Sequence, residues 1–182
     1  MTTLVYILIA VAILIAGILG LAAMRPDTFR VERSIDINAP AETIFPLIND
    51  YKNWPQWSPY ENIDPAMQRT FSGTPSGKGS IYEWSGNKNI GHGRMEIIDT
   101  TPPSKIVIKL DFFSPFEAHN IAEFAMRPQG NATNLATNVT WSMHGPQPFM
   151  AKVMHMFFNM DKMVGGQFEQ GLAGMKAVAE KR

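Results

Sequence analysis

Three polar side chains near the middle of the chain have the types and spacing for acid–base chemistry. Glu83, His92 and Arg94 fall in two neighbouring segments that are predicted to pair as a hairpin. A carboxylate, an imidazole and a guanidinium on one concave surface could abstract a proton next to a carbonyl group, as a cyclase or dehydratase requires. This interpretation needs Glu83 and Arg94 to point inward as an ion pair. The alternative is an ordinary pair of opposite charges that faces water across an antiparallel sheet.

Large aromatic side chains and methionines form a second set of candidates, which could bind an apolar small molecule. Aromatic rings bury much area, and methionine adapts to ligands of variable shape. In the stretch YKNWPQWSPY, Trp54 is interpreted as a core plug, whereas Trp57 and Tyr60 are candidates for an entrance lip. The same side chains could equally be plain core. The candidates for ligand contact are Trp57, Tyr60, Tyr82, Trp84, Arg94, Phe112, Trp141, Met154 and Phe157.

Composition argues against several other kinds of chemistry. The chain has no cysteine, which excludes a thiol nucleophile, a disulfide framework and a thiolate metal site. Its histidines are not spaced as metal ligands, and no glycine-rich phosphate loop or nucleophile elbow is present. Sixteen basic and sixteen acidic residues give no net charge, which argues against a nucleic-acid partner. We therefore expect neither a metal nor a cofactor.

The N-terminal segment is predicted to cross a membrane. Leu4 to Met24 contains no charged residue and is long enough for a hydrocarbon core of about 30 Å. A cleaved secretory signal is the alternative. It is disfavoured because no Lys or Arg precedes the apolar run, and the run exceeds the usual length of about 7–15 residues. Residues 1–25 are thus expected to be an anchor and residues 26–182 a separate domain.

The orientation of this anchor follows from the basic residues around it. Arg25, Arg30 and Arg33 come after the apolar run. The positive-inside rule then predicts a single-pass protein whose C-terminal domain lies in the cytoplasm. A domain on the opposite side of the membrane is the alternative.

The elements that must position these residues form an α+β pattern. Residues 29–38 alternate apolar and polar side chains, as in a strand with one buried face, and a short helix follows from about Asn38. Apolar residues recur at three to four positions from about Pro148 to Lys181, which predicts one amphipathic helix of about thirty residues. Between them, short turns separate strands at 66–72, 79–86, 91–99, 105–113, 117–127 and 133–144, which predicts an antiparallel meander.

Several phrases in this order resemble the START-like, or SRPBCC, superfamily, and within it the polyketide cyclase/dehydrase-like proteins. The resemblance covers nearly all of residues 29–182. It implies a helix-grip fold, in which a curved seven-stranded antiparallel sheet wraps around a long C-terminal helix. It also implies a cavity between sheet and helix for an apolar or amphipathic molecule. The phrases are INAPAETIFPLINDYKNWPQWSP (37–59), FSGTPSGKGSIYEWSGN (71–87), GHGRMEI (91–97), TPPSKIVIKLDF (101–112), VTWSMHG (139–145) and MVGGQFEQGLAGMKAVAE (163–180).

Three functions are compatible with this pattern, because a fold alone does not give a function. The first is membrane-anchored binding of a hydrophobic or amphipathic small molecule, a lipid or a polyketide- or quinone-like compound. The second is a cyclase or dehydratase that uses Arg94 with Glu83 or His92. The third is a ligand-free protein-interaction module, as in chaperone-activator relatives.

Overall fold

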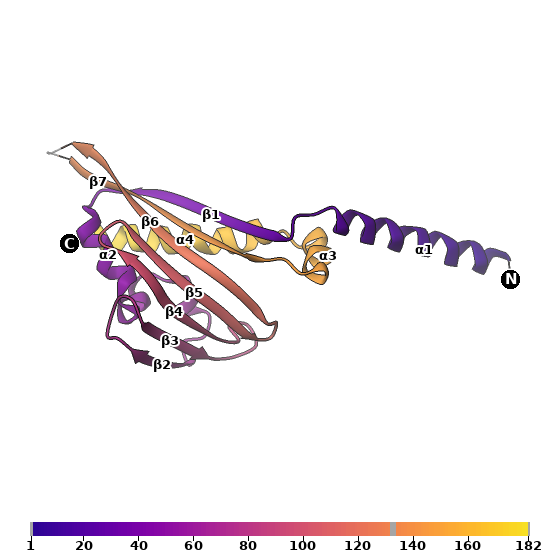
Figure 1. Ribbon diagram of the computed structural model, residues 1–182, viewed down its shortest axis with the longest axis horizontal. Helices are drawn as coiled ribbons and strands as arrows, with labels where there is room; N and C mark the ends of the chain where they lie inside the picture. Colours follow the sequence, from indigo (N-terminus) through magenta and orange to yellow (C-terminus); the bar gives the residue numbers. More distant parts are fainter. Residues whose placement is uncertain (1, 132–133, 182) are drawn as a thin grey trace.

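The computed structural model describes residues 2–131 and 134–181. One apolar helix, α1 (Thr2–Ala23), extends away from a domain that contains all the strands and the other helices (Figure 1). At about 1.5 Å per residue, the 22 residues of α1 reach about 33 Å. The helix is long and apolar enough to cross a membrane, and none of its most apolar stretch is buried against the domain.

The domain is built on a curved seven-stranded sheet. Its strand order is β1-β7-β6-β5-β4-β3-β2, and every neighbouring pair is antiparallel. The predicted meander is therefore confirmed, with β1 closing against the last strand. The strands are β1 (Thr28–Ile37), β2 (Gln68–Gly73), β3 (Ser80–Ser85), β4 (His92–Thr101), β5 (Lys105–Ser114), β6 (Ala118–Asn131) and β7 (Asn134–Pro146).

Short helices connect β1 to β2. The helix α2 (Ala41–Asn49) is followed by two 3-10 helices, η1 (Tyr51–Gln56) and η2 (Pro59–Asn62). The Asp50 side chain caps η1 by accepting a hydrogen bond from the Lys52 N–H at 2.9 Å. Prolines within η1 and at the start of η2 prevent a longer helix, because proline cannot donate the backbone hydrogen bond that a helix interior needs.

The C-terminal region forms two helices, so the prediction of one helix of about thirty residues is wrong. They are α3 (Phe149–Phe157) and α4 (Met160–Ala179). Phe158 has an extended backbone, and the Asn159 side chain accepts a hydrogen bond from the Lys162 N–H at 2.9 Å, which starts α4. The apolar residues keep their helical spacing through this break, so the spacing did not predict that α3 ends at Phe157 and that Asn159 starts α4. The α4 helix lies along the sheet, whereas α3 packs beside α1 (Figure 1).

The core lies between the sheet and α4. Phe168, Leu172 and Met175 of α4 are almost completely buried. The Trp141 ring of β7 stacks on Phe168, with ring centroids 4.1 Å apart. A Cβ atom at Gly171 would come within 2.7 Å of the Trp141 ring, so this glycine lets the helix approach the sheet closely. The expected arrangement of a sheet around a C-terminal helix is thus confirmed for α4.

Candidate functional site

Buried rings fill the space between the sheet, η1 and α4. Trp141 contacts Phe124 and Trp57 as well as Phe168, with centroids 4.8 and 5.7 Å away. Trp54 lies 4.9 Å from Trp57 and 5.4 Å from Tyr51. We call this set the inner aromatic cluster. Its members are Tyr51, Trp54, Trp57, Tyr82, Phe124, Trp141 and Phe168.

The inner aromatic cluster occupies the place where an open cavity was expected. Two hollows in the described part of the chain lie at the edge of this cluster or outside it. One, of about 210 Å³, opens beside β2, and the other, of about 200 Å³, lies on the outer face of β2, β3 and β4. A ligand can therefore enter the space beside α4 only if some of these rings move.

Some polar groups of the cluster have partners and others do not. The Trp54 Nε1–H donates to the Ile48 carbonyl oxygen at 3.0 Å, and the Trp57 Nε1–H donates to the Leu47 carbonyl oxygen at 2.8 Å. These bonds hold both rings against the end of α2. In contrast, Trp141 Nε1, Tyr51 Oη and Ser58 Oγ are buried, and the described residues provide no partner for them. Burying such a group unpaired costs about 1–3 kcal/mol, so these three atoms are candidate ligand contacts.

Tyr51 lies where the inner aromatic cluster meets the surface. It lines the 210 Å³ hollow together with Phe71 and Ser80. The Phe71 ring stacks on Tyr82 with centroids 5.1 Å apart, and Tyr82 lies 5.7 Å from Tyr51. Burial raises the pKa of the Tyr51 phenol, so the group stays a neutral hydrogen-bond donor. The hollow is thus lined by a residue whose hydroxyl is buried and has no partner among the described residues.

The neighbouring tyrosine is fixed by a buried ion pair that sequence reasoning missed. The Tyr82 hydroxyl donates to Glu61 Oε1 at 2.8 Å, and Arg69 Nε donates to Glu61 Oε2 at 2.7 Å. Glu61 is buried although it is charged. No sequence motif predicts this contact, because it forms only when β2 packs back against η2. Tyr51 was visible in the aromatic stretch, but nothing in the sequence distinguished its hydroxyl from the others.

The predicted ligand residues fall into two groups. Trp57, Tyr82, Trp84 and Trp141 are buried, while Tyr60 and Phe112 are partly buried against them. Trp57 was predicted to line an entrance, but its ring is enclosed by its neighbours and is buried. Tyr60 contacts Trp141 with centroids 6.3 Å apart, and Phe112 contacts Trp84 at 5.7 Å.

Met154 and Phe157 lie apart from this group. Both are on α3 and both are exposed. They were expected on the inner face of a single long helix. Because the chain breaks at Phe158 and Asn159, α3 lies beside α1 and its side chains do not reach the inner aromatic cluster.

The candidate acid–base residues lie on the outer face of the sheet. β3 buries Tyr82 and Trp84, so Glu83 points the opposite way. Glu83 pairs with Arg94 in the strand register, but the Arg94 guanidinium bonds to Glu96, with Nη2 and Oε2 2.9 Å apart. The expectation of an inward Glu83–Arg94 ion pair is wrong, because strand alternation sets the direction of both side chains.

The same outer face holds a charged group centred on a buried carboxylate. Asp111 lies opposite Arg94 in the register and is bonded by Lys109 at 2.9 Å and by His119 Nδ1 at 2.8 Å. Burial alone would raise the pKa of Asp111, but the bonds from His119 and Lys109 outweigh it and lower that pKa. The hydrogen bond that the Asp111 carboxylate accepts also raises the pKa of His119.

The 200 Å³ outer hollow brings two of the candidate acid–base residues together. Glu83 and His92 both line it, with Gln68, Thr70, Trp84 and Ser85. Arg94 is not among the lining residues. Across residues 2–131 and 134–181, no group of three or more histidine and acidic side chains could hold a metal ion.

Comparison with known proteins gives a family and a fold. A family model described as polyketide cyclase/dehydrase and lipid transport matches residues 28–180. A solution structure from Thermobifida fusca has 17% sequence identity and a TM-score of 0.60, covering 84% of this chain and 93% of that one. A comparison with curated proteins found no match.

Two further solved structures share the fold. The di-domain ARO/CYC protein BexL from the BE-7585A biosynthetic pathway has 14% identity and a TM-score of 0.57, covering 90% of this chain and 53% of its own. Ara h 8.0201 has 10% identity and a TM-score of 0.52, covering 85% of this chain and 99% of its own. At such identities the likeness establishes the fold alone.

Proposed function

Because the chain belongs to the polyketide cyclase/dehydrase and lipid transport family, we propose that it binds a hydrophobic or amphipathic small molecule between the sheet and α4. Lipids and polyketide- or quinone-like compounds are the class that fits an aromatic interior with few polar groups. The supporting observation is the inner aromatic cluster, which combines large apolar rings with buried polar atoms that find no partner among residues 2–131 and 134–181.

In this proposal the unpaired atoms receive the polar end of the ligand. The Trp141 ring packs against Phe168 of α4, and its buried Nε1–H can donate one hydrogen bond. Tyr51 Oη can donate or accept beside the 210 Å³ hollow. The ligand enters at this hollow and displaces rings that pack against one another when it is absent.

The proposal includes a membrane tether. An α1 helix in the bilayer holds the domain near the phase in which hydrophobic ligands reside. Arg25 and Arg30 follow α1, which favours a cytoplasmic domain under the positive-inside rule. Leu4 to Met24 then forms the membrane-contacting part of a single-pass protein.

Native mass spectrometry tests the binding proposal directly. Full-length protein would be extracted gently from its own host and compared with a form that starts at Pro26. The expected result is an added mass of small-molecule size on both forms, which organic solvent releases. The Trp141→Phe variant should carry less of it, because it removes one unpaired donor and keeps a ring. Folded protein without any adduct in either form would contradict the proposal.

A second candidate function is acid–base catalysis in the outer hollow. The observation that favours it is that Glu83 and His92 line the same concavity. A carboxylate and an imidazole in one hollow can act as a base and an acid. Glu83→Gln and His92→Gln should then abolish turnover of a screened carbonyl substrate without reducing ligand occupancy in the interior. Unchanged turnover in both variants would exclude this site.

A further inference from the structure

We propose that α3 and the β5–β6 turn lie in the surface layer of the bilayer, so that a lipid-contacting face of the domain supplements α1. This inference rests on the proposed membrane tether. We call this face the membrane-facing rim. It consists of Phe113 and Phe116 around the turn and Phe149, Met150, Met154 and Phe157 on α3.

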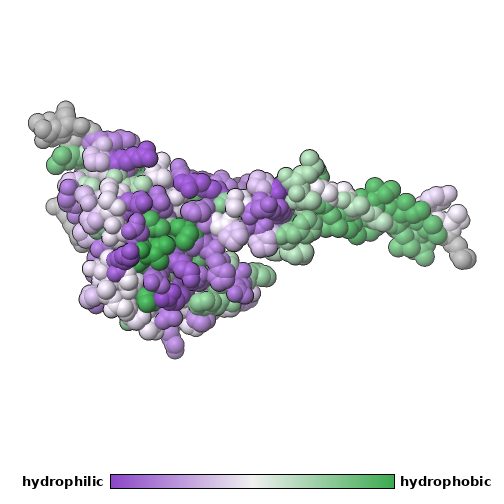
Figure 2. All heavy atoms as spheres, viewed as in Figure 1, coloured by the Kyte–Doolittle hydropathy of each residue, from purple (hydrophilic) through white to green (hydrophobic). Residues whose placement is uncertain are grey.

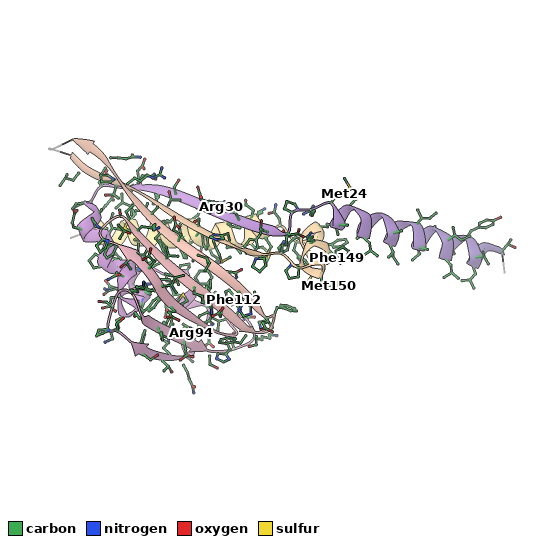
Figure 3. The ribbon with its side chains drawn as sticks, in the orientation of Figure 1. Met24, Arg30, Arg94, Phe112, Phe149 and Met150 are labelled. Atoms are coloured by element: carbon green, nitrogen blue, oxygen red, sulfur yellow. The ribbon has the colours of Figure 1, made fainter. Side chains whose placement is uncertain are left out.

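The first observation is the exposure of these side chains. Phe116 is 71% exposed, Met150 68% and Phe157 67%. Single exposed apolar residues are common on soluble proteins, but a gathering of large ones marks an interaction surface. Figure 2 shows pale green, apolar atoms where the domain adjoins α1, with purple, hydrophilic atoms next to them. In Figure 3, Phe149 and Met150 lie on α3 at the end of the domain from which α1 departs.

The second observation is that the polar side of α3 is already bound to the protein. Lys152 is the buried residue of this helix, and its Nζ donates to Asp27 Oδ1 at 2.5 Å. The Gln147 N–H donates to the Asp27 carbonyl oxygen at 2.7 Å, and its side-chain amide lies 2.6 Å from His155 Nδ1. The His155 ring also contacts Phe29 edge-on. These bonds orient α3 and leave its apolar side facing outward.

The position of α3 next to α1 determines how deep its apolar side would lie in a bilayer that α1 spans. Asp27 lies only four residues beyond Ala23, the last residue of α1, and α3 contacts α1 directly. A spanning α1 would therefore bring α3 to the level at which the chain leaves the hydrocarbon. Short helices with Phe and other apolar residues on one face bind in this boundary layer.

The third observation comes from a separate part of the chain. In the strand register, Thr28 pairs with Pro146, and Ile121 pairs with His144. The start of β6 and the β5–β6 turn therefore lie at the end of the sheet from which α1 departs, as Figure 1 also shows. Phe113 and Phe116 are exposed there. Two segments that are far apart in the sequence thus expose aromatic rings at the same end of the sheet.

The charges near the rim favour apolar insertion rather than attraction to anionic lipid. Glu117 lies inside the turn and Arg25 at the end of α1. Because these charges are opposite, the rim has no dominant sign. We therefore expect contact with a neutral phosphatidylcholine bilayer, with little dependence on salt.

The absence of cysteine allows a direct depth measurement on the full chain. Single variants Met150→Cys and Phe116→Cys would carry an environment-sensitive fluorophore in phosphatidylcholine vesicles that contain acyl-brominated lipid. Ile13→Cys reports whether α1 is in the bilayer. Ser76→Cys, exposed in the β2–β3 loop at the other end of the sheet, is the matched control.

We expect strong quenching at position 13, clear quenching at positions 116 and 150, and none at position 76. Quenching at position 13 with neither or only one of positions 116 and 150 quenched would overturn the proposed rim and leave the tether intact. Protection of positions 116 and 150 from a water-soluble quencher without lipid quenching would also overturn it, by indicating a protein contact. No quenching at position 13 would instead refute the tether.

Discussion

Gly174 of α4 lies against the backbone carbonyl oxygen of Trp57, and a Cβ atom at this position would come within 2.6 Å of that oxygen. The oxygen belongs to the main chain at the end of η1, so it cannot move without also moving the Trp57 ring. Gly174 therefore sets how closely α4 approaches the short helices and, through Trp57, how tightly the inner aromatic cluster is packed.

A methyl group at this contact should destabilise the domain. We expect Gly174→Ala to lower the free energy of unfolding by about 1–3 kcal/mol through overpacking, despite the better helix propensity of alanine. Gly166→Ala is the matched control, because in the described part of the chain nothing outside the helix's own nearby backbone lies within 4 Å of its would-be Cβ. That variant should be more stable by up to about 1 kcal/mol. Urea denaturation followed by tryptophan fluorescence measures the free energy of unfolding of both variants. Equal changes in the two variants would contradict a close contact between Gly174 and the Trp57 carbonyl oxygen.

Two neighbouring tyrosines should respond oppositely to loss of the hydroxyl. Tyr51→Phe removes a buried hydroxyl that has no partner in the described part of the chain, so the ligand-free domain should gain about 1 kcal/mol. Tyr82→Phe breaks the bond to the Glu61 carboxylate and should cost about 1.5–3 kcal/mol. Thermal unfolding of the two variants tests the difference.

Tyr51→Phe should also weaken ligand binding, by the value of one hydrogen bond, or about fivefold to tenfold. Ligand occupancy in native mass spectrometry provides this measurement. Destabilisation by Tyr51→Phe would show that the hydroxyl has a partner in the ligand-free domain, and unchanged ligand occupancy in this variant would show that the hydroxyl does not serve the ligand.

The outer-face charges should not affect binding in the interior. Glu83→Gln and Arg94→Gln are expected to leave ligand occupancy unchanged, because the sheet separates both side chains from the inner aromatic cluster. The Arg94–Glu96 pair is partly exposed, so its loss should change stability by at most about 1 kcal/mol. Reduced occupancy in either variant would instead place the ligand on the outer face.

The His119–Asp111 bond predicts a pH dependence of stability. The pKa of His119 is raised above its ordinary value of 6.5 in the folded state, because the Asp111 carboxylate accepts its hydrogen bond. Its stabilising contribution is therefore complete below the unfolded-state pKa and is lost as the pH rises through the folded-state pKa. The difference in Tm between the natural protein and His119→Gln should shrink from about pH 5.5 to about pH 8.5. A constant difference would contradict this.

The alternation of the first strand illustrates how far the sequence predicts the fold. Its period of two correctly buries Val31 and Ile37 and places Arg33 on the same inner side. The pattern could not supply the reason for an inward arginine. The guanidinium bonds to Asp161 at 2.8 Å and to Glu169 at 2.7 Å, and both acids come from α4, far along the chain.

The candidate site was predicted less well because its properties depend on packing. Trp54 was predicted to be core and is buried, but Trp57 was predicted to line an entrance and is buried as well. Packing against other elements, which local sequence does not reveal, decides whether a ring lines an entrance or fills the core. Whether Trp141 Nε1 has a partner depends on every neighbour at once. Likewise, the outward direction of Glu83 follows from a register that local sequence left open.

The short passage from α1 into β1 has a mechanical consequence. Only residues 24–27 separate the helix from an edge strand of the sheet, and Lys152 clamps Asp27 within that passage. Such a short, bonded connection does not behave as a flexible linker between the helix and the domain. Helices tilt to match the thickness of the bilayer around them. If α1 tilts in this way, the domain would rotate together with it. Bilayer thickness would then set the orientation of the domain relative to the membrane plane.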